Sequence, residues 1–207
     1  MSSEKTGVIQ EKITDGLHSA FDSIIETRSK FFKDHPEKIN KNVDSIIKSY
    51  TRNNAMISGG SSLIPGPWGM LAVTPELVIV IKNQVQMIYD IGQALGQEEK
   101  ITKELLLGIF FAAAGTGAGG LLTVQGGKVL VRRASLRVIQ KIIAMLGGRI
   151  TQQALKSAIS KWLPVVGAAA MAAWTGYMTR NIGRKAEEIF KLDIHDDPST
   201  EDIEIES

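Results

Sequence analysis

Hydrophobic positions recur at helical spacing along most of the chain. They predict one helix over residues 4–32 and a second that starts at Pro36, where proline fits the first turn. A third is predicted from Thr74-Pro75-Glu76, which combines a hydroxyl cap, a first-turn proline and a carboxylate near the positive end of the helix dipole. That helix carries a polar stripe: Lys82, Gln86 and Asp90. No segment alternates as a strand does, so we expect an all-α helical bundle with no substantial sheet.

Two long runs lack any formal charge, residues 105–125 and residues 162–179. The first has 21 residues, enough to cross a hydrocarbon core of about 30 Å as a helix. Its nine strongly apolar side chains contribute only about 4 kcal/mol on an insertion scale, and its glycines add none of that. Insertion is therefore marginal. We predict a central Gly/Ala-rich hydrophobic hairpin, either buried or re-entrant.

Charge divides the chain into three regions, although the total is only +2. Residues 1–54 mix nine Lys/Arg with eight Asp/Glu, as amphipathic helices in water do. The helical core is predicted over residues 55–191, of which residues 128–191 carry twelve Lys/Arg against two Glu. Residues 192–207 carry seven acids and no Lys or Arg, a composition that predicts a disordered acidic tail.

The basic part of the core predicts contact with a membrane. Residues 129–146 fit a basic amphipathic helix that ends at Gly147-Gly148, and each basic residue near an anionic bilayer contributes about 1 kcal/mol. Aromatic side chains that could stack on bases are not interleaved, so lipid is favoured over nucleic acid. An ordinary solvated face around a buried hairpin is the alternative. The predicted lipid contacts are Lys128, Arg132, Arg133, Arg137, Lys141, Trp162 and Trp174.

The sequence gives little support for a catalytic site. Gly115–Gly120 satisfies G-x-G-x-x-G, but no strand-like segment precedes it and no acid follows about 20 residues later. The chain has no Cys, and its three His are scattered, so we predict no catalytic residue, no metal and no cofactor. The first ten residues lack a signal-peptide pattern, which favours the cytoplasm or the cytoplasmic face of a membrane.

Two segments together resemble the EcsC-like bacterial proteins and related helical domains attached to some bacterial GTPases. They are Leu63–Ala72 with the helix ending at Gly96, and Trp162–Met171 with Tyr177–Ala186. Both begin with Pro-Gly turns before a hydrophobic helix, and the turn residues are Pro65, Gly66, Pro67, Pro164 and Gly167. The resemblance implies a helical, often membrane-associated protein, in some bacteria found alongside an ABC transporter linked to secretion. In such proteins an Asp often precedes the first helix, where this chain has Thr74-Pro75-Glu76.

Three functions fit these patterns. The first is a membrane-associated accessory protein without catalytic activity, which binds anionic lipid or a membrane partner through its basic face and hydrophobic hairpin. The second is a soluble helical module that regulates a partner protein. The third is a toxin or effector that inserts the hairpin into a bilayer. Fractionation distinguishes the first two, and dye release from vesicles identifies the third.

Overall fold

The computed structural model describes residues 3–61, 67–114, 120–159 and 164–197, which contain six α-helices, three short strands and the 3-10 turns Pro36–Lys38 and Glu98–Lys100. The helices are α1 (Ser3–Asp34), α2 (Val43–Ser61), α3 (Pro67–Ala94), α4 (Lys103–Ala113), α5 (Leu136–Ile159) and α6 (Pro164–Phe190). The strands are β1 (Leu122–Gln125), β2 (Lys128–Arg132) and β3 (Asp193–Asp197). The expectation of a mostly helical protein is confirmed.

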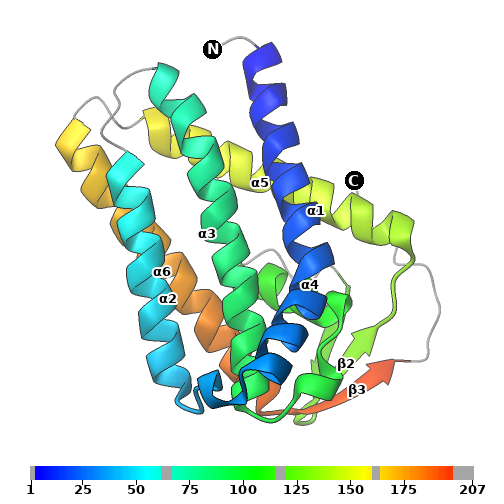
Figure 1. Ribbon diagram of the computed structural model, residues 1–207. Helices are drawn as coiled ribbons and strands as arrows, with labels where there is room; N and C mark the ends of the chain where they lie inside the picture. The colour runs from blue at the N-terminus through cyan, green and yellow to red at the C-terminus, as the bar shows by residue number, and fades with distance from the viewer. Residues whose placement is uncertain (1–2, 62–66, 115–119, 160–163, 198–207) are drawn as a thin grey trace.

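The long helices α1, α2, α3 and α6 are roughly aligned, and α5 crosses them at a steep angle (Figure 1). α2 packs against α3 and α6, and α3 packs against α1 on its other side. Short α4 lies in the middle, with every residue from Leu105 to Phe111 buried. Within the described residues, no helix combines the length and the apolar character that crossing a bilayer requires.

The first uncharged run is not one long helix. α4 covers only its beginning and packs against α6, where the Asn181 side-chain amide donates to the Ala113 carbonyl at 2.7 Å. The same run later enters strand β1. The long transmembrane-length helix that residues 105–125 would permit is therefore not formed.

A small three-stranded sheet lies at one end of the bundle, although no segment of the sequence alternates as a strand does. β1 and β2 are antiparallel across Gly126-Gly127, which have φ of 59° and 79°. Two residues with positive φ form the tight turn that joins neighbouring strands, and glycine adopts it without steric cost. β3 then pairs with β2 in parallel. Residues 193–197, predicted to lie in a disordered tail, thus form a strand, and residues 198–207 lie outside the described residues.

Several predicted helix boundaries are also wrong. Pro36–Lys38 forms a single 3-10 turn, and α2 starts only after Asn42, whose side-chain oxygen accepts from the Ser45 amide at 2.9 Å. α3 starts at Pro67 rather than at Thr74, so Pro75 lies inside it and removes one backbone hydrogen bond. The first-turn preference of proline is met by Pro67 instead.

α5 likewise differs from the predicted basic helix. It starts at Leu136, because residues 129–132 belong to β2, and it continues through Gly147-Gly148 rather than ending there. A Cβ at position 147 would lie 2.2 Å from Thr14 Oγ1 of α1. The glycine thus allows α5 to lie close against α1, and it marks a helix contact rather than a helix end.

Candidate functional site

The predicted lipid-contacting residues fall into two groups with different surroundings. Lys128, Arg132 and their neighbours lie on β2 or just after it, beside the acidic strand β3. Arg132 Nε lies 3.6 Å from Asp197, and Arg133 lies 3.5 Å from Asp196. The positive charge expected of this segment is therefore opposed by the carboxylates of the C-terminal strand.

The second group lies on α5. Arg137 and Lys141 are exposed one helical turn apart, and Arg149 is exposed further along the same helix. α5 contains no Asp or Glu, and within the described residues none of these three side chains forms an ion pair. Leu136 at the start of α5 is 66% exposed. An uncompensated basic face with an apolar end is the arrangement that binds anionic surfaces.

The remaining predicted site residues are separated. Trp174 lies half-buried on α6, whereas the basic residues lie on β2 and α5. Pro67 begins α3, Pro164 begins α6 and Gly167 lies within α6, so these positions belong to helices rather than to turns. Pro65, Gly66 and Trp162 lie outside the described residues.

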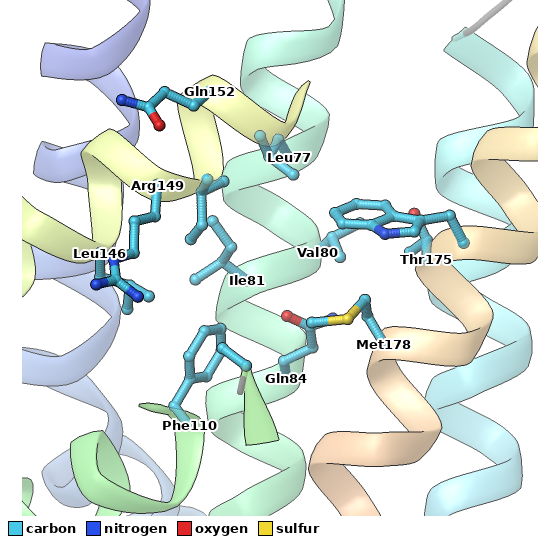
Figure 2. A pocket seen from close by; sticks show the side chains of 13 residues that line it. Leu77, Val80, Ile81, Gln84, Phe110, Leu146, Arg149, Gln152, Thr175 and Met178 are labelled. Atoms are coloured by element: carbon cyan, nitrogen blue, oxygen red, sulfur yellow. The ribbon is translucent and has the colours of Figure 1, made fainter. Parts of the chain in front are cut away.

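A cavity of about 290 Å³ lies where α3, α4, α5 and α6 meet (Figure 2). Its apolar walls come from all four helices: Leu77, Val80, Ile81, Phe110, Leu146 and Met178. Trp174 lines it as well. α5 packs chiefly on α1 rather than on α3 or α6, which leaves the space unfilled.

Four polar side chains complete the cavity wall. Arg149 and Gln152 come from α5 and are exposed, so they mark its open side. Gln84 and Thr175 are buried on α3 and α6, and Figure 2 shows them across the cavity from the two α5 residues. Arg149 is the one charged residue of the lining.

The buried polar groups behind the cavity hydrogen-bond to one another. Gln84 donates its amide to Thr179 Oγ1 at 3.0 Å, and Asn54 of α2 donates to the same oxygen at 3.2 Å. Asn83 donates in turn to Asn54 at 2.8 Å. These bonds satisfy side chains that would otherwise be costly to bury, and they join α2, α3 and α6.

The polar stripe expected on α3 is only partly exposed to solvent. Lys82 is exposed, but Asp90 is mostly buried and accepts two hydrogen bonds from Arg28 of α1, at 2.8 and 2.7 Å. The Tyr50 hydroxyl of α2 donates to it at 2.8 Å. Burial raises the pKa of Asp90, and Arg28 and Tyr50 offset part of that rise. This cluster connects three helices and lies apart from the cavity lining.

Sequence reasoning missed the cavity because its lining comes from residues spread over more than a hundred positions, and no local pattern marks it. It also missed the hairpin turn, for which a signal exists: Gly-Gly between two β-branched runs is typical of a two-residue hairpin loop. Within the described residues, no group of His, Asp or Glu is placed to hold a metal.

Comparison with known proteins adds no relative: the chain matches no protein-family model, no curated protein and no solved structure. The EcsC-like resemblance therefore stays a prediction carried by the two Pro-Gly segments alone.

Proposed function

We propose that this protein is a membrane-associated accessory protein without catalytic activity, which binds an anionic bilayer surface through the exposed basic face of α5. The single observation that supports the proposal is the charge of α5, where Arg137, Lys141 and Arg149 are exposed and no acid is present. Each such residue near an anionic surface contributes about 1 kcal/mol, so three give a moderate and reversible affinity.

The attachment is peripheral in this proposal. The apolar side chains of α4 are buried among other helices and are not available to lipid unless the bundle opens. Leu136, at the start of α5, can enter the boundary between headgroups and acyl chains beside the basic residues. A surface contact of this kind is mainly electrostatic, so salt weakens it.

The experiment is co-sedimentation of the whole protein with vesicles of phosphatidylglycerol and phosphatidylcholine, compared with phosphatidylcholine alone. We expect binding to the anionic vesicles at low salt, release at high salt and little binding to the neutral vesicles. Binding to neither composition at low salt would contradict the proposal and favour the soluble interaction module. Release of a trapped dye would instead favour the membrane-inserting toxin.

A further inference from the structure

The cavity between α3, α4, α5 and α6 has the size of a small-ligand site. Its volume of about 290 Å³ is near the lower end of known ligand pockets. An apolar cavity of about 150 Å³ already admits benzene, so this one can take roughly twice as many heavy atoms. An alkyl chain of about ten carbons has that size.

Its walls favour an aliphatic occupant. Leu77, Val80 and Ile81 form the α3 side, Phe110 of α4 and Met178 of α6 flank them, and these labelled side chains surround the space in Figure 2. The buried polar Gln84 donates one of its two amide hydrogens to Thr179, so this polar group of the wall has a partner within the protein. The inner part of the cavity therefore offers mainly dispersion contacts.

The open side has the opposite character. Arg149 and Gln152 are both exposed and supply several N–H donors, and no acidic residue lines the cavity. An arginine at the mouth of an apolar cavity matches a molecule with an alkyl chain inside and a carboxylate or phosphate at its end. A nucleotide or sugar would find too few polar partners along the inner walls.

We infer that this cavity binds a single-chain anionic amphiphile, with its alkyl chain between α3 and α6 and its anionic head group at Arg149. The inference goes beyond the proposed function, because it does not require the protein to be on a bilayer. A free long-chain carboxylate and the chain of a lysophospholipid share this chemistry, and the test separates them.

The test is calorimetric titration of the whole protein with decanoate below its micelle concentration. Decyltrimethylammonium has the same chain and a positive head group, so we expect it to bind at least about tenfold more weakly beside Arg149. Arg149→Gln removes a charge-assisted hydrogen bond and should weaken decanoate binding about tenfold. Arg137→Gln, an exposed arginine of the same helix outside the cavity, should change it less than about twofold.

A second pair of variants tests occupancy of the cavity itself. Ala114 lines the cavity and Ala112 does not, although both are half-buried near the end of α4. We expect Ala114→Phe to remove decanoate binding and Ala112→Phe to retain it, with circular dichroism showing that both variants are folded. If Ala114→Phe unfolds, Met178→Trp fills the same cavity from α6 and should give the same loss.

The outcomes separate the sources and the two proposals. Binding of decanoate alone assigns the cavity to free carboxylates, and tighter binding of a decanoyl lysophosphatidylglycerol assigns it to bilayer-derived lipid. Equal binding by all four variants, or equal binding of the cationic and anionic amphiphiles, would overturn the inference. Because Ala114→Phe leaves the exposed face of α5 unchanged, it should still sediment with anionic vesicles if the proposed function is right.

Discussion

β2 and α5 are two adjacent basic regions of the chain, and they differ in what surrounds their charges. The arginines at the end of β2 face carboxylates of β3, at 3.6 Å for Arg132 and 3.5 Å for Arg133. The basic residues of α5 are exposed on a helix that has no acid. Both regions are basic in the sequence. Of the two, only α5 presents positive charge that no neighbouring carboxylate in the described part of the chain opposes.

The difference arises from chain topology. β3 follows α6 directly and pairs in parallel with β2, with Arg132 in register with Asp197. This pairing places the acidic strand beside a basic strand that lies more than sixty residues earlier in the sequence. A segment's charge therefore predicts a binding surface only when no distant segment of opposite charge folds onto it.

The largest effect is expected from removing the α5 charges. In Arg137→Gln/Lys141→Gln, two basic contacts of about 1 kcal/mol each are lost, so affinity for anionic vesicles should fall roughly 30-fold. Co-sedimentation over a range of lipid concentrations measures it.

The matched control is Arg132→Gln/Arg133→Gln, which removes the same charge from the region beside β3. Because these arginines already face carboxylates, we expect a loss of less than about threefold. Equal losses for the two double variants would remove the distinction between β2 and α5.

A smaller effect is expected from disturbing the contact that positions α5. A Cβ at Gly147 would overlap Thr14 of α1, so Gly147→Ala should lower the free energy of unfolding by about 1.5 kcal/mol, within the range usual for overpacking. Urea denaturation measures the change.

Gly7→Ala is the control, because Gly7 is helical on α1 and nothing lies within 4 Å of the position its Cβ would take. Alanine there should raise stability by about 0.5 kcal/mol through its better helix propensity. A stable Gly147→Ala variant would show that α5 does not depend on close packing against α1.

The smallest effect is expected from removing the β3 carboxylates that face the arginines of β2. Asp196→Asn/Asp197→Asn removes the two negative charges that face Arg132 and Arg133, so vesicle affinity should rise by about fivefold, equivalent to about 1 kcal/mol. Asp193→Asn alters the same strand, but Asp193 pairs with His195 at 2.7 Å and should change affinity less than about twofold. A rise that is no larger than that of the control would mean that β3 does not mask β2.

The sequence predicts the parts of the fold that depend on local interactions and misses the parts that depend on contacts between distant segments. Helical periodicity predicts α1 almost residue for residue, because the buried Ile13, Leu17 and Phe21 repeat at intervals of four. It fails at β2, where Val131 fits a helix stripe with Ala134 and Val138, whereas the burial of Val129 and Val131 follows the period of two of a strand that pairs with β1 and β3. The sequence also does not predict the cluster around Asp90, because its partners Arg28 and Tyr50 come from two other helices.

The candidate sites show the same limit. Arg137 and Lys141 are identifiable from charge alone, whereas their distinction from Arg132 and Arg133 needs the position of β3. The cavity needs the spacing of four helices and has no local pattern.

The most direct test of the central claim places a reporter on each region. The chain has no cysteine, so Ala144→Cys on the exposed side of α5 and Gln125→Cys beside the hairpin turn can each carry one polarity-sensitive dye. On anionic vesicles we predict a blue shift of the Ala144 dye and no shift of the Gln125 dye, with neither responding to neutral vesicles. A shift of the Gln125 dye without one at Ala144, while the protein sediments with the vesicles, would contradict the assignment of α5 as the membrane-binding face.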